Sequence, residues 1–321
     1  MSKPLISVNI CCFNSAKYIE ETMSSVFQQS FEGYEVIIVD DGSTDRTKEI
    51  IKGYIDLGHP IKYYYQTNKG FGYARSKALE LSSGEWIALL DHDDLWYSDK
   101  LKKQANLIDK HPQVKLFFSN SEWFTDSGEI IRLNIEDPSF KKGVVENALN
   151  RLLTYGCYID SETALINRSA LKECGGFNEQ YFYITDYDTF IRLASKYEIY
   201  YDDSVLAKWR VHEKQASQQM KPTMVFEHVD LFYKILAKYH LNKKVEKKVR
   251  ARLLYYLRQH ATNQFNDRGT KYYFSVLLNG VRAYPYDIRT YLRIFKTIAG
   301  DLIRNCFNVR KYGRQQKILL L

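Results

Sequence analysis

Short apolar segments alternate with longer amphipathic segments over the first 120 residues of the chain. Each apolar segment is rich in Val, Ile, Leu or Tyr, which predicts a β-strand, and the segments between them carry apolar residues at helical spacing. The predicted strands span residues 5–10, 34–39, 61–66, 86–90 and 114–120, and the predicted helices span 16–29, a segment that begins after 43–45, and 73–81. This alternation is typical of a parallel sheet whose faces are covered by helices.

The C-terminal hundred residues have a different pattern, in which helical periodicity dominates. The candidate helices there span residues 225–239, 245–265, 272–283 and 288–307. Residues 221–321 contain 21 Lys and Arg against 6 Asp and Glu, a net charge of +15, whereas residues 1–220 contain 25 basic and 32 acidic residues, a net charge of −7. We therefore expect an α/β domain at 1–220 and a basic, mainly helical region at 221–321.

Composition narrows the class of protein. The chain is 45% hydrophobic and 26% charged, which is ordinary for a globular protein. No segment approaches the ~20 consecutive apolar residues of a membrane-spanning helix, and the opening residues do not resemble a signal peptide. The five cysteines are odd in number and lack CxxC spacing, which argues against disulfide and zinc frameworks. We expect a protein of the reducing cytoplasm.

Two common nucleotide-binding signatures are missing from the sequence. Residues Cys11–Ala16 occupy the turn after the first predicted strand and include no glycine, so the G-x-G-x-x-G signature of dinucleotide-binding folds is missing there. A Walker A sequence is also missing from the chain. The sequence therefore does not predict a dehydrogenase or a P-loop enzyme.

Carboxylates follow two of the predicted strands. Asp40–Asp41 come directly after the predicted strand 34–39, and Asp91–Asp94 come directly after the predicted strand 86–90. In parallel sheets ligands bind at the carboxyl ends of the strands, and a hard divalent cation such as Mg²⁺ or Mn²⁺ would offset the clustered negative charge. A solvated acidic turn would have the same composition, so the run by itself is compatible with either interpretation.

Four motifs, in order, resemble the family 2 glycosyltransferases with the GT-A fold. They are residues 7–14 (SVNICCFN), 39–45 (VDDGSTD), 68–75 (NKGFGYAR) and 84–94 (GEWIALLDHDD). The resemblance covers roughly residues 5–215 and departs from the family at Cys11–Cys12, where Pro-Thr is common. It implies a GT-A, Rossmann-like, mostly parallel sheet with helices on both faces, followed by the C-terminal helical region.

The resemblance assigns nucleotide contacts to Asp41, Asn14, Arg75 and Asp91. Asp41 matches the aspartate that accepts the N3–H of uracil or thymine. A carboxylate can also meet guanine, so the base stays open. Both assignments have an alternative. The segment around Asp41 is also typical of a turn followed by a helix cap, and Arg75 could be a charged residue on the solvent-facing side of a helix.

The resemblance also implies a Mn²⁺ or Mg²⁺ site. Asp93 is the direct ligand, and Asp91 contacts the ribose or the metal or its bound water. His92 is expected to be a spacer that points away, because side chains alternate along an extended chain. His212 resembles the histidine of a Tyr-Arg-x-His segment, which completes the metal shell or contacts the diphosphate, although a lone histidine can equally be structural.

The acidic segment 183–193 resembles the family's Glu-Asp-x-Asp motif at a helix start. Asp186 matches the catalytic carboxylate, which takes the proton from the acceptor hydroxyl. Thr185 stands where the family usually has Glu. Capping of the helix N-terminus is the alternative role for these side chains.

Together these assignments predict a metal-dependent inverting glycosyltransferase. It would move a sugar from a nucleoside-diphosphate donor, with a UDP-sugar favoured, to a hydroxyl of a cell-surface glycan or lipid-linked acceptor. A non-catalytic nucleotide-sugar or glycan-binding protein of the same fold is the alternative, and Asp186 argues against it because a binding protein has no use for a base.

The basic region suggests further partners. No recognised nucleic-acid motif occurs there, so nucleic acid is not expected. The stripe Tyr291–Ile303, beside Arg293 and Arg304, either packs on neighbouring helices or lies on an anionic membrane. The first interpretation allows homo-oligomers through the C-terminal helices, and the second places the protein at the inner face of the cell membrane.

Overall fold

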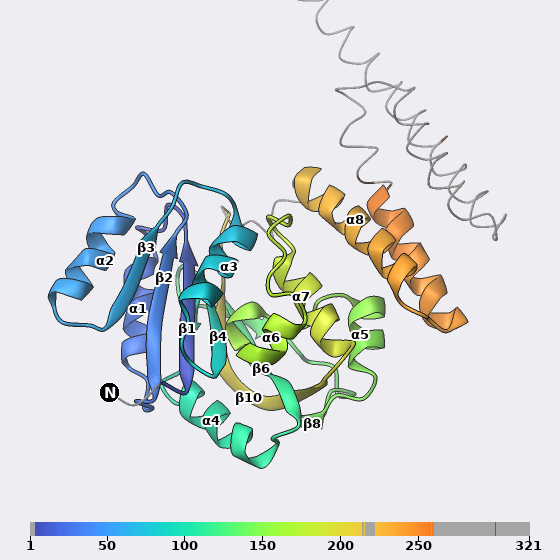
Figure 1. Cartoon of the computed structure of the whole chain (residues 1–321), viewed down its shortest axis with the longest axis horizontal. Helices are drawn as coiled ribbons and strands as arrows, with labels where there is room; N and C mark the ends of the chain where they lie inside the picture. The colour runs from blue at the N-terminus through green and yellow to red at the C-terminus, as the bar shows by residue number, and fades with distance from the viewer. Residues whose placement is uncertain (1–3, 214, 216–221, 258, 260–298, 300–321) are drawn as a thin grey trace, which may run out of the picture. The chain divides into compact units, whose positions relative to one another are not determined.

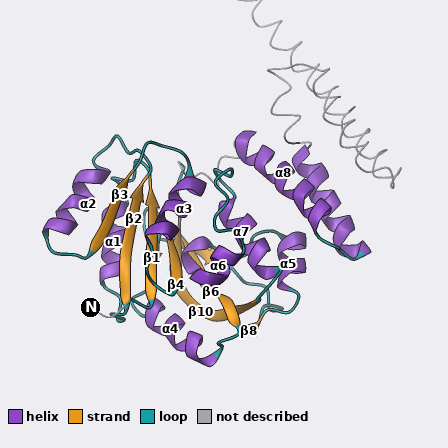
Figure 2. Cartoon of the chain, viewed as in Figure 1, coloured by secondary structure: helices purple, strands orange, loops and turns teal. Residues whose placement is uncertain are grey.

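The structure, a computed structural model, describes residues 4–213, 215, 222–257, 259 and 299. Within these residues a ten-stranded sheet is flanked by helices (Figures 1 and 2). The elements are β1 (Ile6–Cys12), α1 (Ile19–Phe27), β2 (Tyr34–Asp40), α2 (Thr47–Asp56), β3 (Ile61–Tyr65), α3 (Phe71–Leu81), β4 (Trp86–Asp91), β5 (Leu95–Trp96), α4 (Lys100–Lys110), β6 (Val114–Thr125), β7 (Ile130–Leu133), β8 (Gly143–Val144), α5 (Ala148–Tyr155), the 3₁₀ turn η1 (Ser161–Thr163), β9 (Leu165–Asn167), α6 (Arg168–Glu173), α7 (Thr185–Ala194), β10 (Glu198–Val211) and α8 (Pro222–Lys238).

The sheet has the strand order β3-β2-β1-β4-β9-β6-β10-β5, with β7 paired to β6 and β8 paired to β10. Neighbouring strands are parallel from β3 through β4, and the long strands β6 and β10 are also parallel to each other. The short strands β5, β7, β8 and β9 pair antiparallel. The predicted α/β class is confirmed, and the short antiparallel strands are an addition that the strand–helix alternation did not indicate.

Successive side chains of a strand point to opposite faces of the sheet, and helices pack against the buried side chains on both faces. Ile6, Val8 and Ile10 of β1 pack in one core cluster with α1, α2 and α4. Cys11 of the same strand packs on the opposite face in a second cluster, which includes residues of α3. Strand β1 is buried along its whole length, as expected for a central parallel strand.

The strand register brings the two acidic runs to one edge of the sheet. Cys12 is the partner of Asp40 across β1 and β2, and Cys11 is the partner of Asp91 across β1 and β4. Both runs therefore leave the sheet at the carboxyl ends of neighbouring parallel strands, which is where ligands bind in open α/β sheets.

The contacts within the chain divide it into two compact units, Met1–Leu253 and Leu254–Leu321. The first unit includes α8, which lies beyond residue 220, where the sequence analysis places its boundary. The candidate helices at 225–239 and 245–265 correspond to α8 and to helical backbone over 243–257. The candidates at 272–283 and 288–307, with the Tyr291–Ile303 stripe, lie outside the described residues. Among the described helices, none is long and apolar enough to cross a membrane.

Candidate functional site

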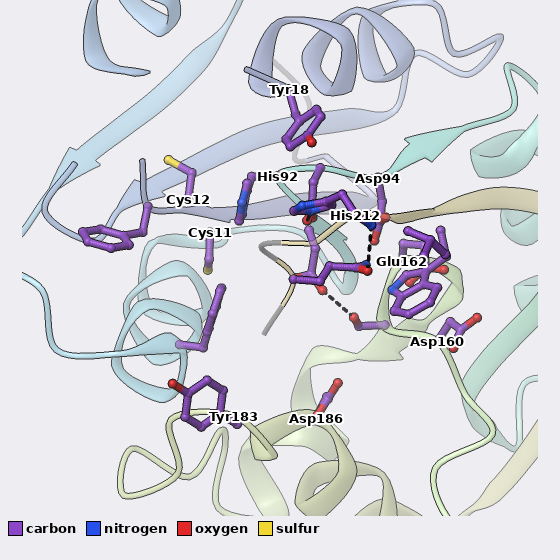
Figure 3. A pocket seen from close by; sticks show the side chains of 18 of the residues that line it. Cys11, Cys12, Tyr18, His92, Asp94, Asp160, Glu162, Tyr183, Asp186 and His212 are labelled. Carbon is purple, nitrogen blue, oxygen red and sulfur yellow. Dashed lines mark hydrogen bonds and ion pairs between the residues drawn. The ribbon is translucent and has the colours of Figure 1, made fainter. Parts of the chain in front are cut away.

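A cavity of about 1020 Å³ lies at the carboxyl ends of β1, β2 and β4 (Figure 3). Its wall is completed by segments that are distant in sequence: the end of β6, the turn η1, the start of α7 and the end of β10. All the site residues predicted from the sequence line it, namely Asn14, Asp41, Arg75, Asp91, Asp93, Asp186 and His212. The structure therefore brings together in one cavity the residues that the sequence motifs singled out.

Asp41 follows β2 and is only 5% exposed. Its carboxylate accepts hydrogen bonds from Gln66 Nε2 at 2.7 Å and from the backbone N–H groups of Lys69 and Gly70 at 2.9 and 2.8 Å. A carboxylate has about four acceptor positions, so most of its capacity holds the loop 66–70 in place. The predicted contact of Asp41 with the nucleotide base stays a prediction.

The loop that Asp41 holds also fits closely against the far side of the cavity. Gly70 has a φ of +94°, and a side chain on it would collide with the ring of Phe182. Gly72 is just as confined, because a side chain there would meet the backbone carbonyls of Asn178 and Tyr181. These two glycines allow the start of α3 to contact the segment that leads to α7.

Asn14 joins the two loops at the mouth of the cavity. It adopts the left-handed conformation with φ of 50°, which Asn tolerates better than most residues. Its backbone N–H donates to Ser43 Oγ at 2.8 Å, and its side-chain oxygen accepts from the Thr44 backbone N–H at 2.8 Å. This geometry is structural, and the nucleotide contact assigned to Asn14 stays a prediction.

Arg75 is a buried guanidinium that bridges two carboxylates. Its Nη2 donates to Asp91 Oδ1 at 3.0 Å, and its Nη1 lies 3.8 Å from Asp186 Oδ2. Burial alone would lower the pKa of Arg75, but the two carboxylates outweigh burial and raise it. The interpretation of Arg75 as a solvent-facing charge is therefore wrong, because the side chain of Arg75 points from α3 into the cavity wall.

Asp93 and His212 form the pair at the predicted metal site. Asp93 Oδ2 and His212 Nε2 lie 2.8 Å apart, although 119 residues separate them in sequence. Burial alone would raise the pKa of Asp93, but the nearby His92 and the hydrogen bond with His212 lower it. The Asp93 carboxylate is thus ionised, as a metal ligand must be.

The donor chemistry of this pair fits a small divalent cation. Two ligands about 2.1 Å from one octahedral ion stand about 3 Å apart, close to the separation of Asp93 Oδ2 and His212 Nε2. Among the described residues, no group of three or more His, Cys, Asp or Glu side chains is arranged to hold a metal. Mg²⁺ commonly takes one or two protein ligands and completes its shell with water and substrate phosphates, so a two-residue site suits it.

Asp91, the other predicted ligand, faces a different set of partners. Its Oδ2 accepts a hydrogen bond from Ser161 Oγ at 2.9 Å, and its Oδ1 accepts from Arg75. Its predicted contact with the metal or the ribose stays a prediction. The expectation for His92 is wrong, because His92 lines the same cavity. Strand β4 ends at Asp91 and the chain turns at once, so the alternation of side chains along a strand does not extend to residue 92.

Asp186 lies in the first turn of α7, opposite the Asp93–His212 pair. Its Oδ1 accepts from the Tyr187 backbone N–H at 2.7 Å, which is the capping contact, while its Oδ2 faces Arg75. Burial raises the pKa of Asp186, and Arg75 opposes that rise. A carboxylate with a raised pKa is a better proton acceptor near neutral pH, so the geometry allows both capping and base chemistry.

Glu227 of α8 is a residue that the sequence analysis missed. Its carboxylate accepts hydrogen bonds from the backbone N–H groups of Phe182, Tyr183 and Ile184 at 2.6, 2.9 and 3.2 Å. It thereby caps α7 from another helix and fixes the segment immediately before Asp186. No sequence signal could have identified it, because capping motifs are local whereas Glu227 lies more than 40 residues from the groups it binds.

A second missed group is the polar run Asp160–Glu162, which lines the cavity beside the Asp91 carboxylate. Asp160 accepts from Ser121 Oγ at 2.6 Å and Trp123 Nε1 at 3.2 Å, and burial raises its pKa to about 6. The only signal in the sequence is three adjacent polar residues in an otherwise apolar stretch, which is typical of many loops.

A sequence profile of the family described as Glycosyl transferase family 2 matches residues 7–175, more than half of the chain. An uncharacterized glycosyltransferase of Rickettsia typhi is 31% identical over 218 residues, which are 67% of this chain and 66% of that protein. TuaG of Bacillus subtilis, a glycosyltransferase assigned to teichuronic acid biosynthesis, is 47% identical over 107 residues, which are 33% of this chain and 42% of TuaG. The matches thus span less than two thirds of the length of these relatives.

A solved structure shares the fold. The crystal structure of S. aureus TarS 1-349 in complex with UDP-GlcNAc has a TM-score of 0.63 and 24% sequence identity, covering 86% of this chain and 79% of that chain. At this identity the likeness concerns the fold alone, and it confirms the GT-A-like architecture that the four motifs predict.

Proposed function

Because the chain belongs to glycosyl transferase family 2, we propose that it catalyses the metal-dependent, inverting transfer of a sugar from a nucleoside-diphosphate donor to an acceptor hydroxyl. The observation that carries this proposal is the position of Arg75 between Asp91 and Asp186. One buried cation thus joins the carboxylate at the end of β4 to the proposed base on α7. A binding protein would gain nothing from a buried carboxylate held in this way, so the alternative of a non-catalytic relative is disfavoured.

The donor nucleotide would occupy the side of the cavity formed by the ends of β1 and β2. Asn14 and Asp41 lie there, and Asp41 keeps one acceptor position beyond the three that hold the loop 66–70. A UDP-sugar is the favoured donor, which agrees with the UDP-GlcNAc bound by the structural neighbour TarS.

Asp93 and His212 would hold Mn²⁺ or Mg²⁺. When bound, the metal would neutralise the diphosphate charge that grows as the nucleotide departs. Asp91 accepts hydrogen bonds from Arg75 and Ser161 and would contact the ribose or a metal-bound water. His92 on the cavity wall would add a further hydrogen-bond donor for phosphate oxygens.

Asp186 would act on the opposite face of the sugar. Its Oδ2 takes the proton of the acceptor hydroxyl while the hydroxyl oxygen bonds to the anomeric carbon and the bond from that carbon to the diphosphate oxygen breaks. A single displacement of this kind inverts the anomeric configuration. Glu227 holds the backbone ahead of Asp186, and Arg75 keeps the carboxylate oriented toward the cavity.

The acceptor would be a cell-surface glycan or a lipid-linked glycan, in keeping with the relative TuaG and its assignment to teichuronic acid biosynthesis. The net charge of +15 in residues 221–321 supports attachment of the protein to an anionic membrane at the cytoplasmic face. Homo-oligomers through the C-terminal helices are the competing role for that region.

The decisive experiment is a panel of UDP-, dTDP- and GDP-sugars incubated with the protein and Mn²⁺ or Mg²⁺, with donor hydrolysis as the readout. We expect metal-dependent hydrolysis with a preference for one UDP-sugar. NMR of the anomeric proton in the first transfer product should show inversion, and retention would contradict the mechanism. Metal-dependent binding without any turnover of the panel would favour the alternative of a binding protein.

Attachment to the membrane has a separate test, which is sedimentation of the full chain with liposomes. Each basic residue near an anionic surface contributes ~1 kcal/mol, and this contribution falls with salt. We expect sedimentation with anionic vesicles at low salt and release at high salt. Protein that stays in the supernatant under both conditions would leave helix packing or oligomer formation as the role of this region.

A further inference from the structure

Glu162 is a buried acid on the cavity wall for which the mechanism above has no role. It lies in η1, its exposed fraction is 0%, and it is among the residues that line the cavity (Figure 3). Neither of its carboxyl oxygens receives a hydrogen bond from another described residue. Buried polar side chains in folded proteins nearly always have a partner, so a group like this one requires a functional explanation.

The surroundings of Glu162 do not neutralise it by ion pairing. Lys100 is the nearby buried amine, and burial lowers its pKa to about 7. Its Nζ donates to Gln104 Oε1 at 2.7 Å and lies over the ring of Trp96, and among the described residues no ion pair joins it to Glu162. Burial raises the pKa of Glu162 well above its usual range, and the nearby carboxylates of Asp160 and Asp91 raise it further. These surroundings therefore favour the uncharged, carboxylic acid form of the side chain.

The backbone that carries Glu162 is rigidly held. The carbonyl of Glu162 accepts from Trp96 Nε1 at 2.7 Å, and the carbonyl of Thr163 accepts from Gln104 Nε2 at 2.8 Å. On the cavity side, Ser161 Oγ donates to Asp91. Two buried contacts and one partly buried contact thus fix the turn from both sides, which is the support that a recognition residue needs.

Resting on the proposed function, we propose that Glu162 is a specificity-determining residue that hydrogen-bonds one hydroxyl or acetamido group of the transferred sugar. The sugar must lie between the diphosphate, at Asp93 and His212, and the attacking hydroxyl, at Asp186. Glu162 follows Ser161, which contacts Asp91. It therefore lines the part of the cavity between the Asp93–His212 pair and Asp186. An uncharged carboxyl group offers one donor and one acceptor, the same pair that a sugar hydroxyl or an amide presents.

The test compares Glu162→Gln with Glu162→Met. Glutamine keeps one donor and one acceptor at the same size, whereas methionine keeps only the volume. Glu35→Gln is the matched control, because Glu35 is a hydrogen-bonded glutamate that does not line the cavity. The readouts are calorimetric affinities with Mn²⁺ for UDP and for pairs of UDP-sugars that differ at one group, such as Glc against GlcNAc and Glc against Gal, together with the Tm of each variant.

The sugar preference is the ratio of the affinities for two UDP-sugars that differ at one group. We expect this ratio in Glu162→Gln to stay within about threefold of the wild-type ratio. In Glu162→Met the ratio should fall by at least about tenfold. The affinity for UDP alone should stay within threefold in all variants. The Tm of Glu162→Met should not fall, because an apolar group replaces a buried acid without partners. Glu35→Gln should keep the sugar preference.

Three results would contradict the inference. The first is a wild-type sugar preference that Glu162→Met retains. The second is a Glu162→Met variant with a lower Tm and weaker UDP binding, which would make the residue structural. A Glu162→Gln variant that loses the preference as fully as Glu162→Met would show that the contact requires the ionised form and would contradict the uncharged contact. Failure of the wild type to bind any nucleotide sugar would instead refute the proposed function, and binding without turnover would leave this test intact.

Discussion

The two sides of the cavity are assembled over very different distances along the chain. On the side of β1, β2 and β4, the functional side chains follow directly from neighbouring parallel strands within the first 94 residues. On the side of α7, β10 and α8, they depend on long-range contacts, such as the Asp93–His212 pair across 119 residues and the hydrogen bonds of Glu227 across about 45. Sheet geometry fixes the first side, whereas tertiary packing fixes the second.

This difference leads us to expect that substitutions on the two sides separate binding from catalysis. Changes at the ends of the parallel strands should weaken the donor complex. Changes on α7 and α8 should instead lower the rate of transfer while the donor still binds, because they disturb the position of the base. The four predictions that follow test this division, beginning with the largest effect.

Asp186→Asn should lower the rate of transfer by about 10²–10⁴-fold while UDP affinity stays within threefold of wild type. The amide has nearly the same shape but cannot accept the hydroxyl proton. Transfer kinetics and calorimetry measure the two quantities. Asp188→Asn is the matched control on the same helix, because Asp188 pairs with Arg192 and does not line the cavity. Transfer by Asp186→Asn within threefold of wild type would exclude Asp186 as the base.

Asp93→Ala should lower the metal-dependent affinity for UDP by about 100-fold, because the site then keeps one protein ligand, His212. Calorimetric titration with UDP and Mn²⁺, with and without chelator, measures this. Asp126→Ala serves as the control, since Asp126 is an acid on the cavity wall that pairs with Lys17. Unchanged metal-dependent affinity in Asp93→Ala would refute the assignment of the ligand.

Glu227→Gln should lower kcat by about tenfold and leave the donor Kd unchanged. The amide offers one acceptor oxygen in place of two and turns its own N–H groups toward three backbone donors, so the start of α7 shifts. Separate measurement of kcat and Kd tests this. Asp230→Asn on the same helix, where Asp230 binds Tyr181 and Lys234, is the comparison. A parallel loss of donor affinity would show that the two sides are not separable.

Glu35 concerns the stability of the strand side of the cavity, and neither donor binding nor transfer. Burial alone would raise its pKa, but hydrogen bonds from Lys62, Ser7 and Ser83 lower it to about 2. A depressed pKa means that the stabilisation is complete above the unfolded value of 4.5 and is lost as the pH falls toward 2. Relative to Glu35→Gln, the wild type should be more stable by on the order of 2 kcal/mol at pH 6. Urea unfolding at pH 6 and pH 3 should show the advantage shrinking, and a constant difference would contradict the linkage.

The part of the site that could be predicted from the sequence follows the same division. Asp41, Asp91 and Asp93 lie at or just after the ends of predicted strands. The apolar pattern of these strands therefore locates them at the carboxyl end of the sheet without any tertiary information. Asp186 is predicted from the resemblance of segment 183–193 to the family's acidic motif at a helix start. Each of these residues lies next to the local signal that identifies it.

The missed residues have no such signal. Glu162 and Glu227 acquire their roles only when segments far apart in sequence meet, and neither belongs to a motif with fixed spacing. The error at His92 has a local cause, because the alternation rule was extended one residue beyond the end of β4, where the chain already turns. The three hydrogen bonds that Asp41 accepts from the loop 66–70 likewise depend on contacts that a sequence does not display.

The close approach of Gly70 to Phe182 has a bearing on how the protein is made. These residues are 112 positions apart, so the ribosome, adding ~5–20 residues per second, needs roughly 6–20 s to deliver the second after the first. All of the strands β1–β4 are synthesised before Phe182, so they can pair with one another during that interval. The nascent chain therefore carries the strand side of the cavity before α7 and its proposed base, Asp186, have been synthesised. Under the proposed function, the chain cannot transfer a sugar until α7 has been made.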